Sequence, residues 1–312
     1  MPDRPHTALS GPKGMSASVR TMLCRPALWV PEHTVTVEET LEQMRRRYDG
    51  HDKLGAVLRA IENSGVRRRH LVHPIGDPLP PPGTAARTRL HLREIRRALP
   101  GVVDEALRSA ELPVAGVDAI VFVSGAGFSM PPITSWMIDK CGFRGDVRQV
   151  PVTGSGYAAG AAAIRRAHDI RIARPGSTVL VVACEVGRPP EVATLLSGAL
   201  PGDAIAAVVV RGPGARGVVL RRDALPVRLG PEEQIPYGRG RDDLSRLLGV
   251  PPGVLRHSRE VRADYGDIAS AAVPAVLQRF FDDDRPAGTD ASIGSHTPAG
   301  AALRRTASFP RL

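Results

Sequence analysis

The residues with the clearest potential for chemistry stand in a glycine turn at the start of a helix. Ser155, Gly156 and Tyr157 occupy this turn, within residues 151–185, which we read as strand, turn, helix and buried strand. The first turn of a helix leaves N–H groups unpaired and carries a partial positive charge, which favours an anionic nucleophile beside it. A phenol, with an ordinary pKa of about 10, gains little from that position at pH 7. The turn is placed for nucleophilic chemistry, but the tyrosine side chain in it suits that chemistry poorly.

The same stretch resembles the nucleophile region of type III polyketide synthases, the chalcone-synthase-like condensing enzymes. In that family a Gly-Cys-x-Ala-Gly turn opens the helix, and GYAAG at residues 156–160 matches it with Tyr157 at the cysteine position. Further matching motifs run from about Pro26 to Arg211, including VDAIVFVSGAGFSM at residues 117–130. The similarity returns at residues 247–271, LLGVPPGVLRHSREVRADYGDIASA.

Two more positions depart from the catalytic set of the resembled family. No histidine stands near Gln234, where the family has a His-Pro-Gly-Gly motif, and Asp267 takes the place of the asparagine in Gly-Asn-Met-Ser. In the family, Cys, His and Asn activate the nucleophile and stabilise the enolate and thioester oxyanion. The resemblance also implies that residues are missing between Glu185 and Pro201 and, in a larger block, between Gly217 and Gln234. Together these departures predict the loss or replacement of condensation.

A replacement acid/base set is conceivable, because the resemblance places His296 in a loop that borders the family's active site. The candidate catalytic residues are Ser155, Tyr157, Asp267 and His296. Each also has an ordinary structural explanation. His296 suits an exposed loop, Asp267 a helix cap and Ser155 an N-cap, and Tyr157 fills the pocket that a thioester would enter.

Three residues are expected to contact substrate or partner by resemblance. Arg59 matches a position that binds the phosphates of coenzyme A, beside the basic run of residues 67–69, and Gly156 flanks the nucleophile position. Met130 matches a methionine that reaches across a twofold interface into the pocket of the partner. The implied partners are an acyl-CoA or polyketide molecule and a second chain, as a homodimer or as a heterodimer with an intact synthase. No cofactor is expected, since the coenzyme A thioester is a substrate.

Composition narrows the remaining function classes. The 312 residues carry a net charge of +10, almost all from arginine, but only 4% aromatic residues, too few for a base-stacking surface. We therefore expect no nucleic-acid partner. No apolar run of about 18 residues is present, so no membrane partner is expected and the cytoplasm is the predicted location. Three separated cysteines, Cys24, Cys141 and Cys184, indicate core positions, and no metal site is expected.

Hydrophobic periodicity predicts alternating helices and strands. Helices are expected at residues 35–48, 54–64 and 90–112, and strands at 119–123, 147–152, 178–183, 205–211 and 217–220. Residues 73–87 are expected to form a proline-rich loop. This alternation favours a parallel-rich α/β sheet, in agreement with the layered αβαβα thiolase-like fold that the resemblance implies, with a truncated second half. The expected organisation is a flexible leader at residues 1–20, an N-terminal half at 21–222 and a shortened C-terminal half at 223–312.

The leading functional prediction is a type III polyketide-synthase-like protein without cysteine-dependent decarboxylative condensation. It would bind acyl-CoA or polyketide, or serve as a partner subunit. The alternative is an acyl-CoA-dependent acyltransferase, hydrolase or polyketide cyclase that uses a non-cysteine acid/base set. A third alternative is an unstable product of the internal gaps, with no activity.

Overall fold

The structure, a computed structural model, describes most of the chain in eight segments. These are residues 20–75, 84–125, 129–153, 158–187, 199–220, 252–283, 290–295 and 301–306. The leader expected at residues 1–20 lies outside them except for its last residue, and so do residues 221–251, which contain the predicted domain boundary.

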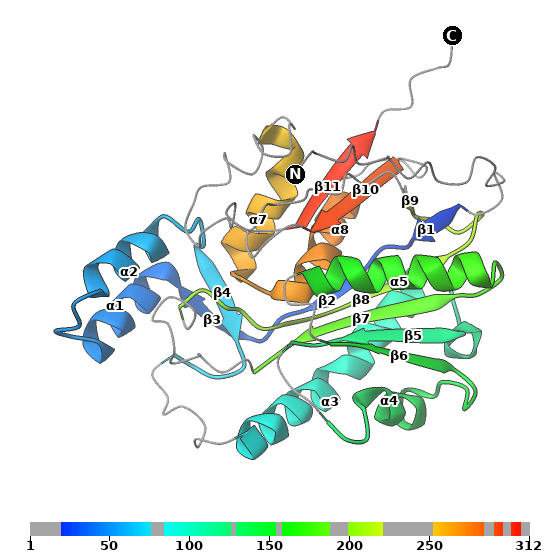
Figure 1. Ribbon diagram of the computed structural model, residues 1–312, viewed down its shortest axis with the longest axis horizontal. Coiled ribbons are helices and arrows are strands. Elements are labelled where there is room, and N and C mark those ends of the chain that lie inside the picture. Colours follow the sequence, from blue (N-terminus) through cyan, green and yellow to red (C-terminus); the bar gives the residue numbers. More distant parts are fainter. Residues whose placement is uncertain are drawn as a thin grey trace, which may run out of the picture.

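A central sheet runs through the described part of the molecule (Figure 1). Its order is β11-β10-β9-β1-β8-β7-β5-β6, with β2 also paired to β8. The strands are β1 (Thr21–Leu23), β2 (Ala27–Trp29), β5 (Ala119–Val123), β6 (Arg148–Val152), β7 (Val179–Glu185), β8 (Ala204–Arg211), β9 (Val218–Leu220), β10 (Asp290–Ser295) and β11 (Ala301–Thr306). All five strands expected from apolar runs are present.

The sheet is mixed rather than parallel-rich. Strands β6, β5 and β7 are parallel, with Val121 paired to Val150 and to Val181, whereas β8 runs antiparallel to β7, β1 and β2. An apolar run predicts a buried strand but not its direction, because direction depends on which strand becomes its neighbour. The parallel strands are nevertheless the ones whose carboxyl ends form the candidate site.

Helices cover both faces of the sheet (Figure 1). On one face lie α5 (Ala159–Ala173) and α8 (Ala272–Asp282), and on the other α3 (Thr84–Ser109) and α4 (Ile133–Cys141). Side chains alternate between two cores, so Val181 packs with the α5 and α8 cluster and its neighbour Leu180 with the α3 and α4 cluster. A strand covered on both faces is apolar along its length, as the first six residues of β7 are, and all seven residues of the strand are buried.

A small layer beside the sheet holds α1 (Val37–Arg47), α2 (Leu54–Glu62) and the two-stranded pair β3 (His33–Thr36) and β4 (Arg68–Leu71). Helix α1 was expected from residue 35, but Val35 belongs to β3. Thr36 ends the strand because it forms a capping box: its side chain accepts from the Glu39 N–H at 3.1 Å, and the Glu39 carboxylate accepts from the Thr36 N–H at 2.7 Å.

Helix α3 is longer than expected at its start. It begins at Thr84, although residues 73–87 were predicted to be a loop, and it continues through Pro100 to Ser109. Apolar periodicity starts only at Leu90, but the preceding AARTR sequence consists largely of good helix formers. Among the helices of the described segments, none is long and apolar enough to cross a bilayer.

Candidate active site

The site lies where the first turn of α5 meets the 3-10 turn Ala269–Ala271, which follows α7 (Arg256–Tyr265). Contact is so close that a Cβ atom built on Gly160 would lie 2.2 Å from the Ser270 carbonyl oxygen. The two motifs that carried the catalytic predictions, GYAAG and YGDIAS, are therefore neighbours. Ser155, Gly156, Tyr157 and His296 themselves lie outside the described residues, so their predicted roles stay predictions.

Asp267 is buried and held on both sides by backbone hydrogen bonds. Its N–H donates to the Leu200 carbonyl at 2.9 Å, and its carbonyl accepts from the Gly202 N–H at 3.0 Å. The side chain is part of this turn, since Oδ1 accepts from the Ala269 N–H at 3.1 Å. The residue is only 6% exposed. Asp267 thus acts as a local cap, and its carboxylate presents acceptors where an amide would also present a donor.

Glu185 ends β7 and is the buried acid of the site. It is 1% exposed, accepts a short hydrogen bond from Ser270 Oγ, and accepts from the Gly125 N–H at 3.2 Å. These contacts join β7, the loop after β5 and the 3-10 turn. No role was predicted for Glu185 from sequence, although a carboxylate that ends the apolar strand VLVVACE is a recognisable signal, because buried acids need partners.

His91 and Ser124 form a second polar pair that the sequence analysis missed. His91 lies in α3 and is 3% exposed, and its Nδ1 pairs with the Val186 carbonyl at 2.7 Å. Its Nε2 lies 3.5 Å from Ser124 Oγ, just after β5. Burial lowers the pKa of His91, and the hydrogen bond to Val186 opposes that effect only in part. The available signal was spacing: His91 shares the buried helix stripe of Ile95.

The basic cluster near α2 divides into exposed and buried members. Arg59 is exposed in the last turn of α2, in keeping with its predicted contact to phosphate. Arg69 is 5% exposed and donates to the Pro201 carbonyl at 3.0 Å. Burial lowers the pKa of Arg69 to about 10, although the charge of Asp203 acts to raise it. The Arg69 side chain is therefore buried and hydrogen-bonded inside the protein, and it is not part of an anion-binding surface.

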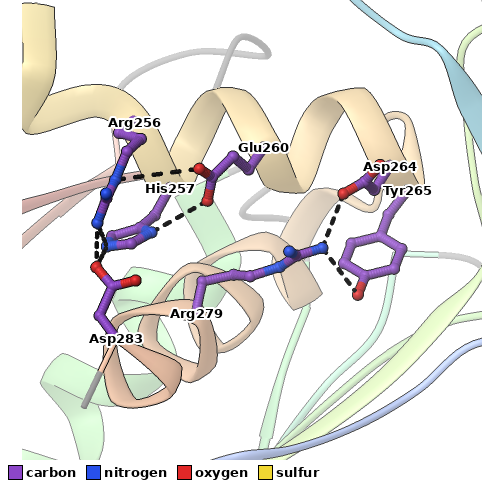
Figure 2. A network of polar contacts seen from close by, with 7 residues as sticks. All are labelled: Arg256, His257, Glu260, Asp264, Tyr265, Arg279 and Asp283. Atoms are coloured by element: carbon purple, nitrogen blue, oxygen red, sulfur yellow. Dashed lines mark hydrogen bonds and ion pairs between the residues drawn. The ribbon is translucent and has the colours of Figure 1, made fainter.

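Asp264, in the last turn of α7, contacts three arginines, and Figure 2 shows one of them, Arg279. Its Oδ2 accepts from Arg279 at 2.8 Å, and its Oδ1 lies 3.1 Å from Arg67 and 3.3 Å from Arg68. Burial acts to raise the pKa of Asp264, but the hydrogen bond and charges of the three arginines outweigh it, so this pKa lies below its ordinary value. Asp264 therefore ties β4 and α8 to α7.

Replacing this carboxylate by an amide is expected to destabilise the fold by about 1–2 kcal/mol at pH 7, because Arg67 and Arg68 are largely exposed and partly screened. A carboxyl whose pKa is lowered by folding stabilises the folded protein at pH values above its unfolded pKa of about 3.9. This contribution is lost as pH falls through the folded pKa. Urea unfolding of the wild type and Asp264→Asn should therefore differ at pH 7, and the difference should shrink as pH falls below about 4 and through the lowered pKa of Asp264. A difference that does not shrink as pH falls below about 4 would contradict this origin.

His257, at the other end of α7, has a structural explanation (Figure 2). Its Nδ1 lies 3.2 Å from Glu260, its Nε2 lies 3.1 Å from Asp283, and its ring meets Phe280 edge-on. Both ring nitrogens face carboxylates, which links α7 to the end of α8. His257 thus holds two helices together.

The cysteines occupy structural positions. Cys184 is fully buried in β7, and burial, followed by the charge of Glu185, raises its thiol pKa well above the ordinary value. Burial likewise raises the pKa of Cys24 and of Cys141 to about 11. A protonated thiol is a poor nucleophile. Within the described ranges, no three His, Cys, Asp or Glu side chains gather in a way that would hold a metal ion.

Met130 is placed on the surface. It is 79% exposed and precedes α4, and the Met130–Pro131 peptide bond is cis. Among the described residues it is the large apolar side chain that is left in contact with solvent. A single exposed apolar side chain is ordinary on a protein surface, so the contact of Met130 with a partner subunit stays a prediction.

A mixed sheet between helical layers, with polar side chains where parallel strands end beside a helix N-terminus, defines a condensing-enzyme fold of the thiolase type. The chain belongs to the type III polyketide synthases, since the family model of chalcone and stilbene synthases, N-terminal domain, matches residues 31–214. The layered fold implied by the sequence motifs is thereby confirmed.

Comparisons with individual proteins agree with this family assignment. The 1,3,6,8-tetrahydroxynaphthalene synthase of Streptomyces coelicolor is 39% identical over 316 residues, which span 84% of each chain. The crystal structure of the enzyme with this name from that organism matches with a TM-score of 0.78 and 37% identity, over 90% of this chain and 97% of that chain. A fungal type III polyketide synthase, 16% identical with a TM-score of 0.74 over 92% of this chain and all of that chain, shares the fold.

Proposed function

We propose that this protein is a non-condensing member of the family that binds an acyl-CoA or polyketide. The observation that carries the proposal is Asp267, a buried carboxylate whose Oδ1 is already occupied by the Ala269 N–H. Condensation needs a donor that stabilises a developing oxyanion, and an ionised carboxylate has only acceptors. Tyr157 at the nucleophile position supports the same conclusion from the sequence.

Binding of the coenzyme A portion is the part of the family function that we propose is kept. Arg59 is exposed on α2, and its guanidinium lies over Gly55, since a Cβ on Gly55 would stand 3.6 Å from an Arg59 terminal nitrogen. A guanidinium held along a helix surface suits a phosphate group. Of the basic run at residues 67–69, Arg67 and Arg68 remain beside Arg59 but are partly neutralised by Asp264, and Arg69 is buried.

Reversing the charge of Arg59 tests this binding mode. Titration calorimetry with acetyl-CoA should show an affinity about tenfold lower for Arg59→Glu than for the wild type, because one phosphate contact becomes a repulsion worth about 1.4 kcal/mol or more. Arg108→Glu, at an exposed site near the end of α3, serves as the matched control and should bind as the wild type does. Equal affinities for the two variants would refute the assignment of Arg59.

We further propose that the protein works as a subunit of a dimer, with itself or with an intact synthase, through the exposed Met130. The proposed organisation remains an N-terminal half at residues 21–222 and a shortened C-terminal half at residues 223–312. The support for this role is the match of Met130 to the methionine that crosses the twofold interface in the family, and its 79% exposure leaves it accessible to a second chain.

A second candidate function is acyl transfer or hydrolysis by a non-cysteine acid/base set. The set predicted from sequence, Ser155, Tyr157, Asp267 and His296, is proposed only in part, because Asp267 is engaged as a cap. The observation that favours this alternative is instead the buried His91, whose Nε2 lies near Ser124 Oγ. His91 and Ser124 thus place a base beside a hydroxyl, which is the arrangement that nucleophilic catalysis requires.

A further inference from the structure

We propose that Ser124 and His91 form a nucleophile and base pair that hydrolyses acyl thioesters. The proposal rests on the acyl-CoA binding inferred above. The bound thioester would be hydrolysed instead of condensed. It uses a serine and a histidine at positions outside the catalytic set expected from the sequence. Every residue in it belongs to the described segments.

The geometry of His91 fixes which nitrogen can act as the base. A backbone carbonyl only accepts, so the contact of 2.7 Å with the Val186 oxygen requires that His91 Nδ1 carries a proton and donates it. In the neutral ring, Nε2 then holds the lone pair, and it is this atom that lies 3.5 Å from Ser124 Oγ. The carbonyl orients the imidazole as a third group does in other hydroxyl nucleophile sites.

The surroundings favour the basic form of the ring. His91 is 3% exposed, and burial lowers its pKa, so the imidazole is neutral at pH 7 and able to accept a proton. Ser124 directly follows β5 and is partly exposed, while the preceding Val123 is 1% exposed. The hydroxyl therefore stands where the buried strand reaches the surface, at the same sheet edge as Glu185. A distance of 3.5 Å is long, as is common for catalytic hydrogen bonds before substrate binds.

The reaction balances with water as the only co-reactant. Ser124 Oγ attacks the thioester carbonyl carbon while its proton moves to His91 Nε2. The carbon–sulfur bond then breaks, and the leaving coenzyme A sulfur takes that proton, which leaves an acyl-serine ester. Water gives a proton to His91 Nε2 and attacks the ester carbonyl. Return of that proton to Ser124 Oγ releases a carboxylic acid and regenerates the pair.

A fluorophosphonate probe tests the pair directly in the full-length protein, because it forms a covalent bond only with an activated serine. Peptide mass spectrometry should locate the label on Ser124, and Ser124→Ala should lose it. In His91→Gln the labelling rate should fall by about 100-fold or more. In the wild type, the rate should stay constant from pH 8 to below pH 6.5 and decline only as pH falls through the lowered pKa of His91.

Matched variants separate chemistry from folding. Ser109→Ala and His33→Gln change a partly exposed serine and an exposed histidine elsewhere, and both should label as the wild type does. Thermal unfolding verifies that each variant is folded, and thiol release from acetyl-CoA should follow the labelling rates. A folded protein that binds acetyl-CoA but shows no label on Ser124, or labels equally fast in His91→Gln, would overturn this proposal and leave the binding proposal intact. Loss of acetyl-CoA binding would instead count against the proposed function.

Discussion

Malonyl-CoA incubated with the purified protein is expected to give no condensed product above background. Loss of a single oxyanion donor lowers turnover by about 10²–10³-fold in enzymes that depend on one. By the motif resemblance, Asp267 stands at the position of the family's donor, and Tyr157 at the position of its thiolate. Activity should therefore lie more than about 10³-fold below that of the Streptomyces coelicolor relative assayed in parallel. Radiolabelled malonyl-CoA with chromatographic detection of products provides the measurement.

Restoration of the family residues makes this prediction sharper. Tyr157→Cys alone should remain near background, because the buried Asp267 carboxylate still presents acceptors to the reacting oxygen. Tyr157→Cys combined with Asp267→Asn should raise the release of carbon dioxide above that of either single variant, since the two changes supply a thiolate and a donor. The amide retains an oxygen for the Ala269 N–H, so the turn is preserved. Measurable condensation by the wild type would contradict the proposed function.

The layers of the fold were predictable because they follow from the spacing of apolar residues. Strands β5 and β7 and helix α2 lie where the periodicity placed them, with ends that shift by at most two residues. The periodicity of apolar residues could not predict the direction of the strands or which strands pair. Antiparallel β8 sits between β7 and β1, and its pairing with β1 joins residues that are more than 180 positions apart in sequence.

The candidate site was predictable only where a local motif carried it. Asp267 stands out because it occupies a known position in a motif, and the structure places that motif beside α5. The meeting of Glu185 with Ser270, and of His91 with Ser124, joins segments that no local pattern connects. Each of these residues alone suits an ordinary interior position. Their chemistry arises from tertiary contact, which a single sequence does not report.

Gly160→Ala is expected to be the most damaging single change in the described part of the site. The added Cβ would lie 2.2 Å from the Ser270 carbonyl oxygen, which belongs to the backbone and cannot rotate away as a side chain does. Relief requires that α5 and the 3-10 turn separate, which also displaces the Ser270 hydroxyl from Glu185. Overpacking typically costs 1–3 kcal/mol, and we expect a loss of about 3 kcal/mol because the clash is with backbone.

Gly101→Ala is a control that makes the same chemical change but is expected to have the opposite effect on stability. Gly101 lies inside α3, and a Cβ there would meet no atom within 4 Å, so alanine should add about 0.5–1 kcal/mol through its higher helix propensity. The Tm from thermal unfolding should thus move in opposite directions for the two variants, by about 5 °C downward for Gly160→Ala and slightly upward for Gly101→Ala. Equal stability of both variants would mean that α5 and the turn at Ser270 do not make this contact. The two motifs would then not share one site, because the Gly160 to Ser270 approach is what brings the helix N-terminus to Asp267.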